Sequence, residues 1–146
     1  MGGLLQSGIW WIRTLHIITA LWLTAGVFAS AVVFALQKRT SDPAARAFAT
    51  KVAWRLLTVY TLPGALISGA LGIYQAMARF GFQGGWIHAS LTLWLILLAT
   101  TLFVQMPKIR EALRTGGTVP PVAAMLSHVN ALLIVLMVFL MAFKPF

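Results

Sequence analysis

Four long stretches without a charged residue occupy most of this 146-residue chain. They cover residues 14–37, 56–78, 80–107 and 115–143. A helix needs about 20 apolar residues to cross the hydrocarbon core of a bilayer, and each stretch is long enough. Because backbone N–H and C=O groups in lipid must bond to one another, these stretches favour helices over open strands. The sequence therefore predicts an all-α, integral membrane protein.

The connections between these stretches are short, so consecutive helices should run antiparallel in an up-down four-helix bundle. We expect one transmembrane domain over residues 1–146, with helices at approximately 8–37, 53–78, 85–106 and 119–143. A short helical segment in the first connection could begin near Ser41, Asp42 and Pro43, where Ser or Asp caps and proline follows. The first apolar run is too long for a cleaved signal peptide, so we expect this helix to be retained.

The basic residues are concentrated on one side of the predicted bundle. The chain has 11 Lys and Arg but only two acidic residues. Eight basic residues fall in the first and third connections: Lys38, Arg39, Arg46, Lys51, Arg55, Lys108, Arg110 and Arg114. Such an excess marks the cytoplasmic side, which predicts a multi-pass protein of the bacterial inner membrane with both termini outside. Since topology explains the charge, we expect membrane lipid as a partner and no nucleic acid.

Composition also excludes several kinds of site. The chain has no cysteine, which excludes disulfides, iron–sulfur clusters, thiolate haem ligation and covalent haem attachment. Its only acids, Asp42 and Glu111, lie in the basic connections, and no phosphate-binding glycine loop is present. If the protein is an enzyme, its chemistry must come from a bound cofactor or from the substrate.

All three histidines fall inside the apolar stretches, where an imidazole is costly unless something uses it. His16 follows Arg13 by three residues and His88 follows Trp86 by two, so both should lie about one helical turn below the outer surface. The two imidazoles could then face each other across the bundle, as the axial nitrogens of a haem do. We therefore expect His16 and His88 to be metal ligands in a haem b site. His128 is a third candidate, at a deeper level reached from the inner side.

Other interpretations of these residues remain open. Each histidine could instead bond a hydroxyl or carbonyl of a neighbouring helix, or the imidazoles could hold copper or zinc. The methionines also suit copper, but those within apolar runs usually serve as filler. Arg13, one turn before His16, could pair with a haem propionate or extend to water at the membrane edge.

Four motifs are similar to those of one family of membrane enzymes. The first helix contains Trp-Ile-Arg-Thr-Leu-His at residues 11–16, and the second contains Thr-Leu-Pro-Gly at 61–64. The third begins Gly-Trp-Ile-His-Ala-Ser-Leu at 85–91, and the chain ends Ala-Phe-Lys-Pro-Phe at 142–146. Over essentially its whole length, and in this order, the chain resembles HemJ-type protoporphyrinogen IX oxidases and the wider group of CopD-like small membrane proteins.

The resemblance implies a haem b protein with His16 as a ligand and redox chemistry on a porphyrinogen. The chain departs from the family pattern at Ser90, where the family has lysine, and at His128, where it has glutamate. The polar end of the family's first helix is apolar here, over residues 31–36. Losing groups that handle protons should impair an oxidase more than an electron carrier.

We therefore expect a haem b binding redox protein that transfers electrons, with other membrane redox subunits or further copies of itself as partners. One alternative is retained oxidation of protoporphyrinogen IX. Another is a CopD-like copper-transport or structural membrane subunit without haem.

Overall fold

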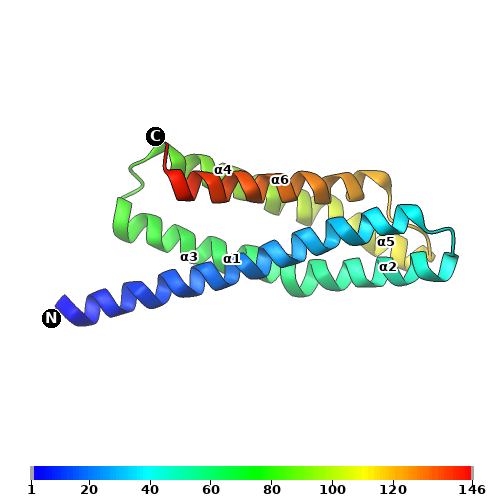
Figure 1. Ribbon diagram of the computed structural model, residues 1–146, viewed down its shortest axis with the longest axis horizontal. Coiled ribbons are helices and arrows are strands. Elements are labelled where there is room, and N and C mark those ends of the chain that lie inside the picture. The colour runs from blue at the N-terminus through cyan, green and yellow to red at the C-terminus, as the bar shows by residue number, and fades with distance from the viewer. Residues whose placement is uncertain (1, 146) are drawn as a thin grey trace.

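The computed structural model describes residues 2–145, with side chains from residue 10 onward, and is an all-α up-down bundle (Figure 1). Phe146, the last residue of the terminal motif, lies outside the described residues. The elements in chain order are α1 (Gly2–Arg39), α2 (Pro43–Arg55), η1 (Leu56–Thr61), α3 (Leu62–Gln75), η2 (Ala76–Phe80), α4 (Gly85–Thr100), η3 (Thr101–Gln105), α5 (Met106–Thr115) and α6 (Pro121–Phe143). Elements labelled η are π-helical. Both chain ends lie at one end of the bundle, called here the terminal end (Figure 1).

Four continuous helical spans are long and apolar enough to cross a membrane. They are Trp10–Arg39, Pro43–Phe80, Gly85–Thr115 and Pro121–Phe143, with mean hydropathies of 2.1, 1.6, 2.0 and 2.3. Large apolar side chains cover their outward faces, among them Trp11 at 70% and Phe103 at 78% exposure. An apolar surface of this extent belongs against lipid rather than water. The protein is a multi-pass membrane protein, and the prediction of an all-α four-helix bundle is confirmed.

The helices extend further than predicted at the end opposite the termini, called here the basic end. The first connection is only Thr40–Asp42, because α2 begins at Pro43. The Asp42 carboxylate accepts the N–H groups of Ala44 and Ala45 at 3.1 Å, a helix cap of the kind predicted. However, α2 continues without a break into the second span, and α5 continues the third span to Thr115.

The remaining boundaries differ by smaller amounts. The first helix begins at Gly2 rather than near residue 8, and the last begins at Pro121 rather than near 119. All eight basic residues assigned to connections lie within α1, α2 or α5. The sequence prediction failed here because charge was taken as the end of a helix, whereas a helix can continue past the membrane surface.

Two of the π-helical segments have a local cause in proline. Pro63 and Pro107 each follow a π segment by two residues. A proline ring clashes with the carbonyl four residues earlier, which is Val59 in η1 and Phe103 in η3. Widening the turn relieves this clash without ending the helix. The two spans therefore stay continuous but carry an irregular turn where they cross the bundle interior.

Small residues bring α1 close to the second span. A Cβ added to Gly64 would lie 2.6 Å from the backbone nitrogen of Leu23, and one added to Gly26 would lie 2.7 Å from Thr61 Oγ1. Close approach of this kind is how membrane helices gain packing energy where lipid is as apolar as the protein. On its other side, α1 packs against α6, and α6 packs against α4. Gly26 and Gly64 therefore provide the close contact between α1 and the second span.

We expect Gly64→Ala to lower the free energy of unfolding by about 1–3 kcal/mol, because its methyl group would overlap the backbone of α1. Gly8→Ala is the matched control, since nothing lies within 4 Å of a Cβ at that position. Thermal unfolding in detergent measures both. Equal stability of Gly64→Ala and the wild type would contradict the close packing of α1 on α3.

Candidate functional site

His16 lies on α1 and is held by a backbone carbonyl of α3. Its Nδ1 is 2.9 Å from the carbonyl oxygen of Ser68, and the side chain is half-buried. A carbonyl oxygen only accepts, so Nδ1 donates, and in the neutral ring the lone pair is on Nε2. Within residues 2–145, no protein hydrogen bond engages this Nε2. Histidines that bind metals commonly donate their second ring N–H to a carbonyl in this way.

The small-residue face of α3, formed by Ala65, Ser68, Gly69 and Gly72, creates the space for this ring. A Cβ added to Gly72 would lie 3.1 Å from Cε1 of His16. One turn earlier, Gly69 receives the indole of Trp94 from α4. The Trp94 Nε1–H donates to the carbonyl of Ala65 at 2.9 Å. The imidazole of His16 from α1 and the indole of Trp94 from α4 thus pack against the same face of α3.

His88 has different surroundings from those of His16. It lies in the first turn of α4, is exposed, and its Nε2 is 3.1 Å from the carbonyl of Phe82 in the preceding turn. In the neutral ring Nε2 is the donor and Nδ1 holds the lone pair. The Phe82 ring lies beside the imidazole, with centroids 6.3 Å apart. The contacts of His88 and His16 share no residue, so their pairing as opposite ligands stays a prediction.

His128 lies on the outward surface of α6, between the inward-facing Ser127 and Asn130. Its Nδ1 donates to the carbonyl of Ala124 in its own helix at 2.9 Å, which satisfies one ring nitrogen and leaves Nε2 toward the surroundings. Within a single chain, His128 therefore belongs to the lipid-facing surface and not to the small-residue face of α3.

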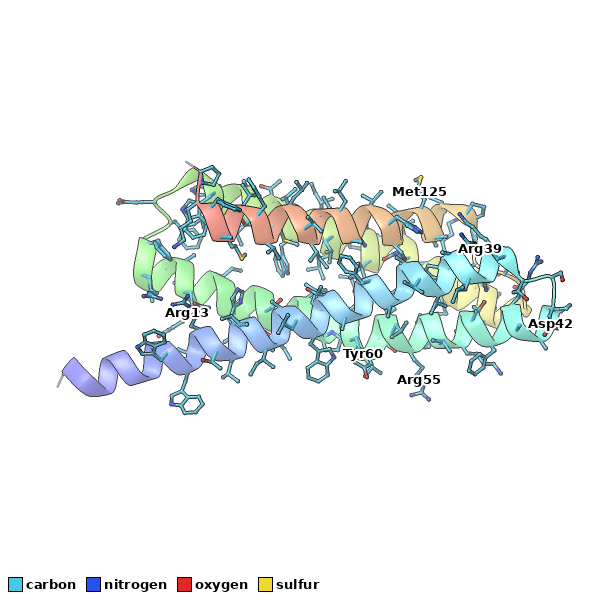
Figure 2. All side chains as sticks on the ribbon, in the orientation of Figure 1. Arg13, Arg39, Asp42, Arg55, Tyr60 and Met125 are labelled. Atoms are coloured by element: carbon cyan, nitrogen blue, oxygen red, sulfur yellow. The ribbon has the colours of Figure 1, made fainter. Side chains whose placement is uncertain are left out.

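Arg13 is exposed at the terminal end, one helical turn before His16 (Figure 2). Its guanidinium lies 5.7 Å from the centre of the Trp10 ring. The only acids of the chain, Asp42 and Glu111, lie in the basic half of the bundle, at the start of α2 and within α5. Arg13 is therefore a cation at the membrane edge with no Asp or Glu side chain near it among the described residues.

Lys144, from the terminal motif, closes the same end of the bundle. Its Nζ lies 5.1 Å from the centre of the Phe80 ring and 5.3 Å from that of Trp86. The two rings pack edge to face with centroids 5.2 Å apart. These cation–π contacts tie the end of α6 to the turn between the second and third spans.

No group of three His, Asp or Glu side chains in the described chain comes together to hold a metal ion. Two of the methionines considered for copper serve the interior instead: Met137 packs beside Leu97 and Ile134, and Met106 packs against the core near Phe34. Within the described residues, a metal bound through His16 must therefore take its remaining ligands from a cofactor, from water or from at most one further His, Asp or Glu side chain.

No protein-family model, curated protein or solved structure matches this chain.

The sequence prediction missed the role of α3 in this site. The sequence alone favours a general packing role for Ala65, Gly69 and Gly72. In the structure, Gly72 makes room for the His16 ring and Gly69 makes room for Trp94. The available signal was their spacing of four and three residues, which puts all three on one helix face. That spacing predicts a close contact between α3 and a neighbouring helix, but not which side chain packs there.

We expect each neutral histidine to carry its hydrogen on the ring nitrogen that bonds a backbone carbonyl. In ligand-free protein, ¹⁵N spectra of histidine-labelled samples should show Nδ1–H for His16 and His128 and Nε2–H for His88. The exposed His88 and His128 serve as internal controls for His16. A neutral His16 that carries its hydrogen on Nε2 would contradict the bond to Ser68 and remove the free lone pair from Nε2.

Proposed function

We propose that the protein binds haem b through His16 and transfers electrons within the membrane. One observation supports this most directly: the Ser68 carbonyl holds Nδ1 of His16, so Nε2 keeps its lone pair. His88 and His128 also bond through one ring nitrogen, but both are exposed, whereas His16 is half-buried against α3. The resemblance to HemJ-type proteins, which also implicates His16, points in the same direction.

The residues around His16 suit a flat apolar cofactor. The small-residue face of α3 accommodates the His16 ring at Gly72 and, one turn away, the Trp94 indole at Gly69, so small and aromatic residues surround His16 on this side. Arg13 supplies a positive charge, away from both acidic side chains of the chain, for an acidic group at the membrane edge. When bound, haem b would supply reversible one-electron chemistry at iron. His16 would hold the iron and Ser68 would hold the ring of His16 in place.

The side chain at position 90 favours electron transfer over porphyrinogen oxidation. Ser90 is 4% exposed on the inward face of α4, and its hydroxyl has no partner among the described residues. The HemJ-type family that the chain resembles has lysine at this position, but here both acidic side chains of the chain lie in the basic half of the bundle. A charged lysine at position 90 would be buried without a counter-ion. Position 90 therefore has no ionisable side chain that could accept a proton removed from a porphyrinogen.

The charge distribution supports an orientation in a bacterial inner membrane with both termini outside. Arg39 and Asp42 lie at the basic end, whereas Arg13 lies toward the termini (Figure 2). Positive charge is retained on the cytoplasmic side, so the basic end belongs there. The exposed apolar faces of the spans would contact lipid and, in a redox complex or homo-oligomer, neighbouring subunits.

We expect His16→Ala to abolish haem retention while the protein still inserts, because it removes the proposed ligand. His16→Gln separates this effect from packing, since a glutamine amide can still donate to the Ser68 carbonyl. His128→Ala is the matched control, because His128 also donates Nδ1–H to a carbonyl but lies on the lipid-facing surface. The haem content per purified protein is the measurement.

Full haem content in both His16 variants would contradict the assignment. Loss of haem in His88→Ala but not in His128→Ala would identify His88 as the opposite ligand, whereas the reverse result would transfer that role to His128.

The orientation has its own test. We expect a cysteine at Gln83, in the turn at the terminal end, to react with a membrane-impermeant thiol reagent in spheroplasts, and a cysteine at Ser41 to react only after lysis. Both positions are exposed, and the chain has no native cysteine. Gln83 is preferable to Gly84, whose φ of 146° disfavours a side chain. Labelling of Ser41→Cys but not Gln83→Cys in spheroplasts would reverse the topology.

A further inference from the structure

A small cavity lined by both polar and apolar side chains lies where the four spans meet, separate from the small-residue face of α3. Its volume is about 10 Å³, the size at which one water molecule can be held. Five polar side chains line it: Ser30 from α1, Thr61 from η1, Gln105 from η3, and Ser127 and Asn130 from α6. All five are buried, with 1–4% exposure. Polar groups at this depth in a membrane bundle need partners inside the protein.

Most of these groups have partners. Gln105 Nε2 donates to Ser127 Oγ at 2.8 Å and to the carbonyl of Ala123 at 3.2 Å. Asn130 Nδ2 donates to Gln105 Oε1 at 3.1 Å. Ser30 Oγ donates to the carbonyl of Gly26 at 2.8 Å and retains lone pairs that can accept. The side-chain amide hydrogens of Gln105 and Asn130 are thus all donated, while oxygen lone pairs such as those of Ser30 Oγ can still accept a hydrogen bond.

Thr61 is the exception. Its Oγ1 has no partner within the described chain, and the residue is 1% exposed. Other hydroxyls in these spans donate to the carbonyl four residues earlier, as Thr58 does to Trp54 at 2.8 Å. For Thr61 that carbonyl belongs to Leu57 and accepts the N–H of Leu62 in the wide π turn. An unsatisfied buried hydroxyl is destabilising, so its position on the wall of this cavity points to a ligand there.

We infer that this cavity binds a single water molecule that accepts the hydroxyl hydrogen of Thr61 and donates to open acceptors on the α1 and α6 walls. Buried waters typically make two to four such bonds. A monovalent cation is disfavoured, because no carboxylate lines the cavity and an uncompensated charge inside the bundle is costly. The water would thus bridge η1 to α1 and α6.

The sign of a stability change tests this inference. Thr61→Val keeps the shape of the side chain but removes its hydroxyl. If water is present, the variant loses a bonding partner and unfolds at a lower temperature, with a larger drop than Thr58→Val, which loses only a bond within its own helix. A drop no larger than that of Thr58→Val, or a rise in the unfolding temperature, would overturn the inference, because removing an unpaired hydroxyl from a dry cavity relieves a penalty.

A second measurement on the wild-type protein does not depend on folding of a variant. In bilayers, magnetisation transferred from water should reach the side-chain amides of Gln105 and Asn130. The indole N–H of Trp94 is the control, since it is bonded to Ala65 away from the cavity. No transfer to Gln105 and Asn130 beyond that seen at Trp94 would overturn the inference. A thermal stability that rises with sodium at constant ionic strength, and no longer does so in Thr61→Val, would identify a cation instead and also overturn it.

Discussion

Every polar group below the membrane surface must find its hydrogen-bond partner inside the protein, and the rest of this structure follows from that constraint. It requires continuous helices, which persist through Pro63 and Pro107 by widening into π turns rather than by ending. It also explains why buried hydroxyls turn back to their own helix, as Ser30 does to Gly26. Where local partners are insufficient, amides bond across helices, as Gln105 does to Ser127. The bundle is a nearly complete set of such pairs.

The incomplete pairs are therefore the informative positions. His16 has one ring nitrogen bound to Ser68 and the other without a protein partner, and it lies on a helix face cleared of side chains by Gly72. Thr61 has a hydroxyl without a partner on the wall of a cavity. The free ring nitrogen of His16 suits a metal centre, because a neutral imidazole offers a lone pair. The unpartnered hydroxyl of Thr61 suits water, because a hydroxyl both donates and accepts hydrogen bonds.

Hydropathy predicted the spans and their antiparallel order, because crossing a bilayer fixes length and polarity. It could not predict where helices continue past the membrane, so α2 and α5 were taken for connections. Sequence position predicts a depth for His16 and His88, but not the direction in which each points, which depends on helix rotation. Their contacts differ accordingly: α3 holds His16, and the turn at Phe82 holds His88. The spacing of the small residues of α3 can be read from the sequence, but the side chains that pack against them cannot.

We propose that Nε2 of His16, which has no protein partner among the described residues, binds a haem. This assignment is tested by the absorption spectrum of the protein, expressed with ample haem supply and purified in mild detergent, before and after reduction. We expect a Soret band and, on reduction, an α band typical of haem b, at a haem content comparable to that of the protein. A correctly inserted and folded protein whose spectrum has neither band would contradict the assignment.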